Sequence, residues 1–424
     1  MLPKVDLSGQ IRFGSSDIST SSATRWSLSA GGGGAGGGGG EGGGGDGVGR
    51  ASDGRAVFVR GALIGETVNA VTTEEKTKFL RANTVSVLEP NDHRIKPFCS
   101  HVQDGCGGCN LQHADEELQK QIKLRIVREA FERIGKFDSA PINYGGSIDP
   151  IGYRTTVRCS VHHGKAGMRG FRSHDHIPLS SCGIAHERVQ EIMTKSYFGD
   201  VDEVVIRTSI LTGNSLVIVS DFDKAIKTPN NVQVISYDQI QKGESASIVE
   251  QVCGKEWRIS AESFFQASPQ GSELLVRTIT EIIKNNLTSS ASMIDLYSGV
   301  GVFAGTIGVG RQVTAIEQSA SAANDSIYNL GNTVNHVCSR VEHWEIVPHD
   351  FVVANPSRSG MSKKVPDIIE RTGAQLVILI SCDAAAAARD AGRMVGKGFR
   401  LDDVTVLDLF PQTSHLEVIS TFVR

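Results

Sequence analysis

The C-terminal part of the sequence predicts a doubly wound α/β fold, in which helices cover both faces of a parallel sheet. The prediction rests on short apolar runs, on helical periodicity between them, and on glycines placed just after one run. The runs lie at residues 293–297, 313–317, 351–354 and 376–380. Such runs are typical of strands buried on both faces, and their alternation with helices favours a Rossmann-like sheet. We expect this domain to occupy residues 261–424.

Three regions are expected to precede that domain. Residues 1–46 hold a Ser-rich start and a glycine-rich tract, a composition that cannot bury enough apolar surface to become ordered. Residues 47–98 carry short strand-like runs separated by glycines and predict a small β-barrel. Residues 99–260 are expected to form a central α+β domain.

Periodic apolar positions predict the main elements of the central region and the first helix of the α/β domain. Apolar residues recur every four positions from Leu118 to Ile134, which predicts a helix with one buried face. The runs at residues 157–162, 203–208 and 215–219 predict strands. A further helix is expected over Glu273–Ile283.

Composition restricts the class of protein. A chain of 424 residues is long enough for two or three domains, and 39% hydrophobic with 21% charged residues is ordinary for a globular protein. Its apolar runs are too short to span a bilayer, and no secretory signal is visible, so a cytoplasmic protein is expected. The eight cysteines therefore favour metal binding or catalysis over disulfides. A net charge of −4 does not exclude a nucleic-acid partner, because phosphate binding needs only a local basic surface.

A glycine loop follows the run at residues 293–297. Gly299 and Gly301 stand between that run and a predicted helix, where a ligand could approach the backbone closely; a merely tight turn is the alternative. The next predicted strand ends at Glu317, whose carboxylate could accept hydrogen bonds from both hydroxyls of a ribose. Because the full three-glycine dinucleotide spacing is missing, the pattern favours S-adenosylmethionine over a pyrophosphate cofactor.

Cys382 is a candidate nucleophile. It follows the apolar run that ends at Ile380, at the carboxyl end of a predicted parallel strand, where doubly wound proteins place their chemistry. A buried structural cysteine is the alternative and the commoner outcome for a lone cysteine in a strand. Glu417 ends the polar, turn-rich segment 410–417 and is a candidate base, with a solvated strand carboxylate as its alternative.

Several motifs, in order, resemble those of the bacterial RNA (uracil-5-)-methyltransferase family, of the 23S rRNA uracil-5-methyltransferase type. They are Phe264-Phe-Gln266, Asp295-Leu-Tyr-Ser-Gly-Val-Gly301, Asn355-Pro-Ser-Arg-Ser-Gly360, Ser381-Cys-Asp383 and His415-Leu-Glu417. The resemblance covers the chain from about Gly47 to Arg424, and it implies a class I methyltransferase domain, a central iron–sulfur domain and an N-terminal barrel of the TRAM or OB type.

The resemblance also implies a covalent mechanism and a cofactor site. The thiolate of Cys382 would add to carbon 6 of a uracil and make carbon 5 nucleophilic toward the methyl group of S-adenosylmethionine, and Glu417 would then remove the carbon-5 proton. The cofactor would be held by Gln266, Tyr297, Glu317 and Asn355 beside Gly299. This sequence departs from the family pattern at three places near these residues: Asn355 stands where aspartate is usual, Val302 where a polar residue is frequent, and Asp383-Ala384 where Asn-Pro is usual.

A compact cysteine loop precedes the helix at residues 118–134. Cys99, Cys106 and Cys109 form a clustered ligand set, and the glycines between them let the backbone fold tightly around a metal centre. The family pattern supplies Cys182 as the fourth ligand of a [4Fe–4S] cluster. Four thiolates could equally bind zinc, because spacing alone does not separate the two.

Structured RNA is the expected partner. Five basic residues between positions 151 and 176 form a candidate phosphate-binding patch: Arg154, Arg158, Lys165, Arg169 and Arg172. An ordinary solvated face is the alternative for each single arginine. The run Gly54–Glu66 resembles part of a TRAM domain, which could hold RNA while the target base flips out.

Together these features predict one function and leave two alternative functions. We expect a monomer that takes part in rRNA processing by methylating a uridine of 23S rRNA, with the T-loop of tRNA as the alternative target. A non-catalytic RNA-binding protein that retains the fold, and an enzyme of the same fold that acts on a small molecule or a protein, are the two rivals. The basic region and the cysteine set argue against the second rival.

Overall fold

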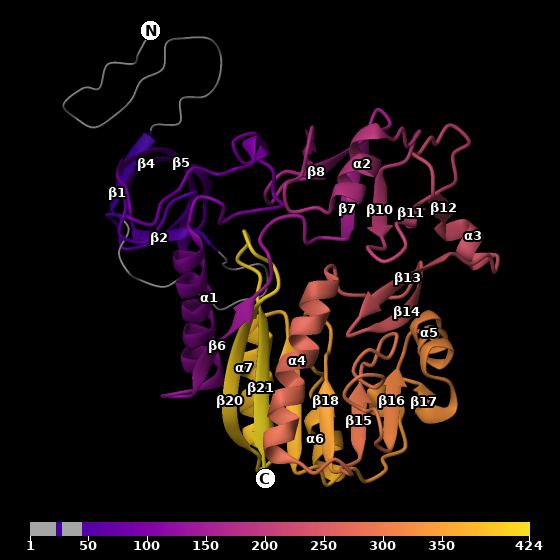
Figure 1. The fold of residues 1–424 in the computed structure, drawn as a ribbon. Helices are drawn as coiled ribbons and strands as arrows, with labels where there is room; N and C mark the ends of the chain where they lie inside the picture. Colours follow the sequence, from indigo (N-terminus) through magenta and orange to yellow (C-terminus); the bar gives the residue numbers. More distant parts are fainter. Residues whose placement is uncertain (1–22, 28–44) are drawn as a thin grey trace. The chain divides into compact units, whose positions relative to one another are not determined.

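The computed structural model describes residues 23–27 and 45–424, and its contacts divide the chain into two compact units (Figure 1). The first unit comprises the described residues up to Phe98, residues 109–130 and residues 412–414. The second comprises residues 99–108, 131–411 and 415–424. Within the described ranges, no helix combines the length and the apolar composition needed to cross a membrane.

The first unit contains a five-stranded sheet with the order β1-β4-β5-β3-β2. Val57, Val68 and Leu80 belong to its apolar core. Most of the disorder expected for residues 1–46 lies outside the described residues, but Ala23–Ser27 differ, because they form β1 and pair with β4. The strands are β1 (Ala23–Ser27), β2 (Gly47–Arg50), β3 (Ala56–Arg60), β4 (Thr67–Glu75) and β5 (Phe79–Glu89).

The first unit also contains the helix predicted from the apolar residues between Leu118 and Ile134. It is α1 (Glu116–Ala130), and the π-type turn that follows it, η2 (Phe131–Gly135), already belongs to the second unit. A strict four-residue spacing drifts by about 40° per step around a helix of 3.6 residues per turn. The predicted stripe therefore leaves the buried face, and Ile134 is 36% exposed whereas Val127 is fully buried.

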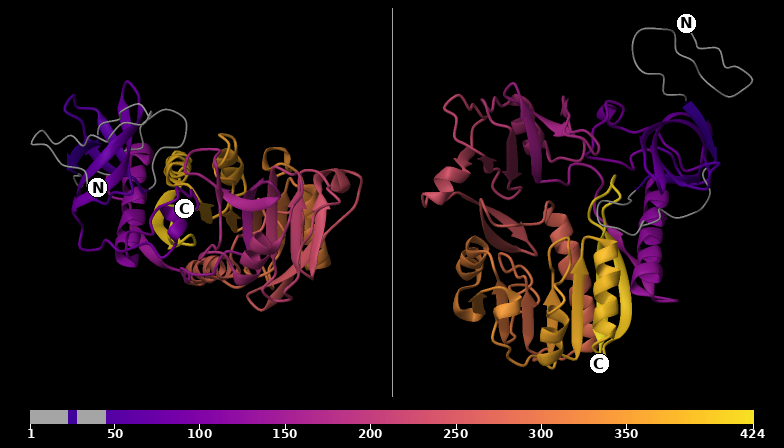
Figure 2. Two further views of the ribbon diagram at one scale, coloured as in Figure 1. Left: turned by 90° about the horizontal axis from the view of Figure 1, so that it is seen from above. Right: turned by 180° about the vertical axis from the view of Figure 1, so that it is seen from behind.

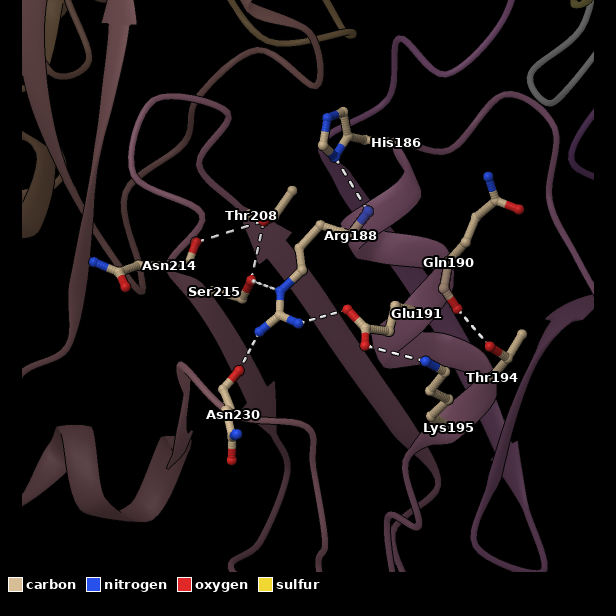
Figure 3. A network of polar contacts seen from close by, with 10 residues as sticks. All are labelled: His186, Arg188, Gln190, Glu191, Thr194, Lys195, Thr208, Asn214, Ser215 and Asn230. Atoms are coloured by element: carbon tan, nitrogen blue, oxygen red, sulfur yellow. Dashed lines mark hydrogen bonds and ion pairs between the residues drawn. The ribbon is translucent and has the colours of Figure 1, made fainter.

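The central part of the second unit is built on a six-stranded sheet with the order β12-β11-β10-β7-β8-β9. Helix α2 packs on this sheet through Val189, Ile192 and Met193. Arg188 of α2 donates to Ser215 and Asn230 and pairs with Glu191 (Figure 3), which ties the helix to the sheet. The elements are η1 (Ser100–Val102), β7 (Thr156–His162), β8 (Lys165–Arg169), β9 (His176–Pro178), α2 (Glu187–Lys195), β10 (Glu203–Thr208), β11 (Ser215–Val219), β12 (Val232–Ser236), α3 (Tyr237–Gln241) and the hairpin β13 (Ser247–Val252) and β14 (Lys255–Ser260).

The C-terminal part of the second unit contains an eight-stranded sheet with the order β17-β16-β15-β18-β19-β21-β20-β6. Helix α4 covers one face, and α6 and α7 cover the other (Figures 1 and 2). Each predicted apolar run became a strand. The elements are α4 (Pro269–Asn286), β15 (Met293–Leu296), β16 (Val313–Glu317), α5 (Ala320–Leu330), η3 (Gly331–Thr333), β17 (Asn335–Cys338), η4 (Val341–His343), β18 (Phe351–Ala354), α6 (Val365–Arg371), β19 (Leu376–Ser381), α7 (Ala384–Val395), β20 (Arg400–Asp408) and β21 (Glu417–Val423).

One strand of this sheet comes from the region expected to be a separate central domain. β6 (Ile142–Ser147) pairs in parallel with β20 at the edge of the sheet. Its residues alternate between half-buried and exposed, because an edge strand has a neighbour on one side only. The two domains predicted to meet at residue 260 therefore share one sheet.

Candidate active site

Four of the predicted residues lie where neighbouring parallel strands end. They are Tyr297 after β15, Glu317 at the end of β16, Asn355 after β18 and Cys382 after β19. β15 pairs in parallel with both β16 and β18, so the strand order reverses there. Ligands of doubly wound proteins bind outside the carboxyl ends of the strands at such a point.

The glycine loop after β15 is open on one side and closely packed on the other. Three residues have a positive φ: Tyr297 at 61°, Gly299 at 55° and Gly301 at 93°. A Cβ at Gly299 would meet no atom within 4 Å, whereas one at Gly301 would lie 2.7 Å from Ser326 and Leu330. The prediction of a helix directly after the loop is wrong, because residues 300–310 form a series of turns rather than a regular helix. Gly305, Gly308 and Gly310 lie within these turns, and glycine has a high conformational cost in a helix.

Two acidic residues hold the loop in place. Glu317 accepts the N–H of Gly299 at 2.9 Å through one oxygen and the N–H of Ser319 at 2.7 Å through the other. Asp295 is fully buried and accepts the N–H of Ala304 at 2.9 Å. Its second oxygen has no hydrogen-bond partner among the described residues, and burial raises its pKa to about 8. A buried acceptor without a partner is a candidate contact for a donor on a ligand.

A cleft of about 250 Å³ opens beside these strand ends. The structure describes all five predicted cofactor residues. Tyr297 is the only one of these five that lines the cleft. Three lining segments follow β16, β17 and β18, and none of the lining residues in them was predicted to bind a ligand. The residues that line the cleft are Tyr297, Ile316, Gln318, Ser339, Arg340, Val341, Glu342, Ser357, Ser359, Gly360, Met361 and Ser362.

Gln266 lies in the segment that leads into α4. It is half-buried, between exposed Phe264 and the helix cap. Ser268 caps α4 by accepting the N–H of Gly271, and the carbonyl of Ala267 accepts the N–H of Thr155 at 2.7 Å. These contacts hold the backbone around Gln266 without placing its side chain in the cleft.

A buried carboxylate on α7 holds one wall of the cleft. Asp390 is fully buried, accepts the N–H of Met361 at 2.7 Å and pairs with Arg393 at 2.9 Å. Arg393 in turn donates to the carbonyl of Met361, and Arg389 donates to that of Ser359. Because α7 begins at Ala384, two positions after Cys382, this network also ties the cleft wall to the helix that follows the predicted nucleophile.

Replacing Asp390 with asparagine tests this connection. Asp390→Asn leaves Arg389 and Arg393 without their buried counter-charge, so we expect a loss of about 3 kcal/mol in unfolding free energy. It should also weaken the binding of S-adenosylhomocysteine roughly tenfold, the value of one charged hydrogen bond. Calorimetry on the folded protein measures the affinity. Asp367→Asn, which removes the exposed partner of Lys397, is the matched control and should change neither quantity. Unchanged affinity in a folded Asp390→Asn protein would mean that the network does not shape the cleft.

Pairing of β19 with β21 brings Cys382 and Glu417 together. The antiparallel register matches Ser381 with Val418, so the next position along each strand faces Cys382 with Glu417. Glu417 also pairs with Leu407 of β20 and is 2% exposed, whereas Cys382 is half-buried. The two predicted catalytic side chains are therefore neighbours, although 34 positions separate them in the sequence.

Burial controls the protonation of this pair. It raises the pKa of Cys382 to about 11, with Glu417 adding to the increase and Arg358 opposing it. It also raises the pKa of Glu417 to about 8. Burial therefore favours the neutral thiol of Cys382 and the neutral carboxylic acid of Glu417 in the resting site. The departure at Asp383 has a structural role, because Asp383 caps α7 by accepting the N–H of Ala386 at 2.8 Å.

Three of the four predicted metal ligands, Cys99, Cys106 and Cys182, lie near one another. Cys99, Cys106 and Cys182 belong to the second unit, and the pKa of Cys182 is raised first by burial and then by the nearby thiols of Cys106 and Cys99. Cys109 is buried and belongs to the first unit. Among the residues that the structure describes, no group of three or more cysteine, histidine or acidic side chains is arranged to hold a metal ion. The donor atoms suit a metal, but their arrangement here does not.

The five basic residues of the central region separate into two groups. Arg158, Arg169 and Arg172 line a second hollow. Arg154 donates to the carbonyl of Thr156, and Lys165 to that of Ser196. The predicted patch is thus smaller than the sequence indicated, but its three arginines converge.

Comparison with known proteins places the chain. No family model matches it. It is 31% identical to an uncharacterised RNA methyltransferase of Streptomyces coelicolor over 416 residues, which cover 87% of this chain and 88% of that one. An uncharacterised RNA methyltransferase of Caldanaerobacter subterraneus is 28% identical over 430 residues, with 88% and 94% covered.

Among solved structures, the chain is similar to the tRNA (uracil-54, C5)-methyltransferase of Pyrococcus abyssi in complex with S-adenosyl-L-homocysteine. The TM-score is 0.67 at 19% identity, over 89% of this chain and 97% of that one. That likeness, together with the strand order, shows a class I methyltransferase fold. The identity and coverage of the Streptomyces relative show that the chain belongs to the RNA methyltransferase family.

Proposed function

We propose that the protein transfers the methyl group of S-adenosylmethionine to carbon 5 of a uridine in RNA through a covalent Cys382–uracil adduct. The proposal is supported by the Cys382–Glu417 pair, because the β19–β21 register makes these two positions neighbours. A nucleophile with a base next to it is the pairing that covalent catalysis requires.

The strand ends suit S-adenosylmethionine. Gly299 leaves room for close approach, and Glu317 is held by two backbone N–H groups with lone pairs remaining for ribose hydroxyls. Asp295 has an oxygen without a partner among the described residues, and Tyr297 lines the cleft. Gln266 and Asn355 complete the proposed set. When bound, S-adenosylmethionine supplies an electrophilic methyl group.

Cys382 opens the reaction. Its thiolate forms a bond from sulfur to carbon 6 of the uracil, and the electrons of the C5–C6 double bond shift toward carbon 5 and oxygen 4. Carbon 5 then takes the methyl group, whose bond to sulfur breaks with both electrons remaining on that sulfur. Because burial raises the resting pKa of Cys382 to about 11, the thiol gives its proton to solvent before it attacks, and Arg358 favours that loss.

Glu417 closes the reaction. As a carboxylate it removes the proton from carbon 5, the electrons re-form the C5–C6 double bond, and the C6–sulfur bond breaks to return the thiolate. A carboxylate with a pKa near 8 is a stronger base than an ordinary one when ionised. Its burial therefore suits proton abstraction.

We propose 23S rRNA as the target, with the N-terminal sheet acting as a TRAM-like RNA-binding barrel. tRNA is the second candidate, because the Pyrococcus abyssi enzyme of similar fold is a tRNA (uracil-54, C5)-methyltransferase. A non-catalytic RNA-binding protein remains the rival from another class. An assay for methyl transfer distinguishes it from both enzymatic candidates, because such a protein would methylate neither 23S rRNA nor tRNA.

We propose that Cys99, Cys106, Cys109 and Cys182 hold a [4Fe–4S] cluster, on the chemistry of four thiols in two sequence segments. The described arrangement is not closed around a metal, and no step of the reaction passes through it. Iron and acid-labile sulfide in anaerobically purified protein would support the cluster. Zinc without iron would contradict it and indicate a zinc site instead.

The deciding experiment incubates the protein with S-adenosylmethionine labelled in its methyl group and with 23S rRNA or tRNA transcripts. Nucleoside analysis by mass spectrometry should find labelled 5-methyluridine at one site in one of the two RNAs. Label on another atom or base would overturn the proposed chemistry, and RNA binding without label would favour the non-catalytic rival.

A further inference from the structure

A hollow of about 210 Å³ lies in the central part of the second unit, away from the strand ends that carry Cys382. The glycines of the cysteine loop, Gly107 and Gly108, form one side of it. Arg158, Arg169 and Arg172 contribute the basic groups, and Glu203 is the single acid among its lining residues. The proposed methyl transfer does not use any of these side chains.

The strand register explains why the charges converge. β7 and β8 pair Ser160 with Gly167 in antiparallel register, so continuing the register by two positions brings Arg158 opposite Arg169. Two like charges directly opposite one another across a sheet repel. Glu203, on the neighbouring strand β10, forms ion pairs with both: one directly with Arg158, and one at 3.4 Å with Arg169.

The loop that carries Arg172 is fixed to the cysteine loop. The N–H of Gly107 donates to the carbonyl of Arg169 at 3.0 Å, and the N–H of Phe171 donates to that of Gly105 at 3.1 Å. A Cβ at Gly107 would lie 3.0 Å from backbone atoms of Arg169, Gly170 and Phe171. The guanidinium of Arg172 lies over the ring of Phe171 at 5.0 Å. The floor of the hollow is therefore hydrogen-bonded, closely packed backbone, with a cation and an aromatic ring at its edge.

The exposed fractions of the three charged side chains distinguish the Arg158–Glu203–Arg169 cluster from a buried structural salt bridge. The side chains of Arg158 and Arg169 are 62% and 47% exposed, and that of Glu203 is 29% exposed. Exposed ion pairs contribute little to stability, so burial does not explain why two arginines share one carboxylate. A phosphodiester has the same single charge and the same two-oxygen geometry that arginine recognises.

We propose that this hollow binds a backbone phosphate of the RNA substrate, and that Glu203 occupies the place of that phosphate in the free protein. Glu203 keeps Arg158 and Arg169 together until RNA arrives, and the arginines then exchange the carboxylate for the phosphate. The nucleotide attached to that phosphate would meet Phe171 and Arg172 at the rim. The inference rests on the proposed RNA substrate and adds a contact remote from the catalytic pair.

Two variants of opposite effect test it. Arg158→Gln should weaken binding of a short single-stranded RNA roughly tenfold and lower the slope of log affinity against log salt by about 0.7, the value of one phosphate contact on a single strand. Glu203→Gln should strengthen binding roughly threefold, because the phosphate no longer competes with a carboxylate. Fluorescence anisotropy at several salt concentrations measures both, with unfolding temperatures recorded for each protein.

Arg400 and Asp402 form an exposed ion pair at 2.7 Å on β20, and Arg400→Gln and Asp402→Asn are the charge-matched controls. The Glu203→Gln gain must exceed that of Asp402→Asn, and the Arg158→Gln loss must exceed that of Arg400→Gln. Weaker binding in Glu203→Gln, or effects equal to those of the controls, would overturn the inference. A wild-type protein that binds no RNA would remove both the inference and the proposed function. Binding that follows the predicted pattern without any methyl transfer would remove only the proposed chemistry.

Discussion

Cys382→Ala is expected to abolish methyl transfer, with a fall of roughly 10⁴-fold or more, as for the loss of other covalent nucleophiles. In the proposed reaction, carbon 5 of the uracil becomes nucleophilic only after the thiol has added to carbon 6. RNA containing 5-fluorouridine makes the effect visible, because fluorine in place of the carbon-5 proton prevents release of the enzyme. With S-adenosylmethionine present, the wild-type protein should accumulate a covalent complex that survives denaturing electrophoresis, and Cys382→Ala should form none.

The control for this result is a second thiol outside the site. Cys253 is exposed in the turn between β13 and β14, so Cys253→Ala should form the adduct at the wild-type rate. Affinity for S-adenosylhomocysteine should be the same in all three proteins, because Cys382 is not among the residues that line the cleft. An adduct that persists in Cys382→Ala would show that another residue is the nucleophile.

The strands of the α/β domain were predictable because their side chains are buried on both faces. The runs at residues 313–317 and 351–354 became β16 and β18 with the predicted limits, since a continuous apolar run between polar turns leaves little choice of boundary. β6 was missed for the opposite reason. It is an edge strand with alternating, half-exposed residues and two adjacent glycines, and only its pairing with β20 makes it a strand.

The site was predictable one residue at a time but not as an arrangement. Cys382 stands at a strand end that the apolar run reveals, whereas its pairing with Glu417 depends on β21 inserting antiparallel between β19 and β20. Residue spacing does not encode that topology, and the family resemblance supplied the pair. The cleft wall around Ser339 and Arg340 was missed because the preceding strand, β17, has four residues, none of them buried.

The difference between the predicted and the observed cysteine set has a related cause. Spacing placed Cys99, Cys106 and Cys109 in one short loop, but among the described residues no three cysteine, histidine or acidic side chains are arranged to hold a metal ion. Short sequence separation limits how far thiols can lie apart, but it does not impose tetrahedral convergence. Whether these cysteines hold the proposed cluster is therefore decided by measuring iron, sulfide and zinc in the purified protein, and not by the spacing of the cysteines.

Glu417→Gln is expected to separate the two halves of the reaction. Attack by Cys382 and methyl transfer need no base at carbon 5, so the variant should methylate once and remain attached to ordinary, unfluorinated RNA. Turnover should fall roughly 10³-fold, within the range for loss of a general base. Glu281→Gln, which changes an exposed glutamate on α4 paired with Lys284, is the control and should turn over normally. Rapid release of methylated RNA by Glu417→Gln would contradict the assigned role.

The same substitution should also change the pH dependence of activity and of stability. Below pH 8 the wild-type rate should rise with pH, because Glu417 must ionise from a pKa of about 8. Since the folded pKa lies above the unfolded value of 4.5, the folded state binds the extra proton and loses stability as pH rises between those values. Glutamine has no such proton, so the variant should be more stable than wild type by about 3 kcal/mol at pH 7 and by nothing below pH 4. Urea unfolding at several pH values measures this difference, and a difference independent of pH would mean that Glu417 is not buried as an acid.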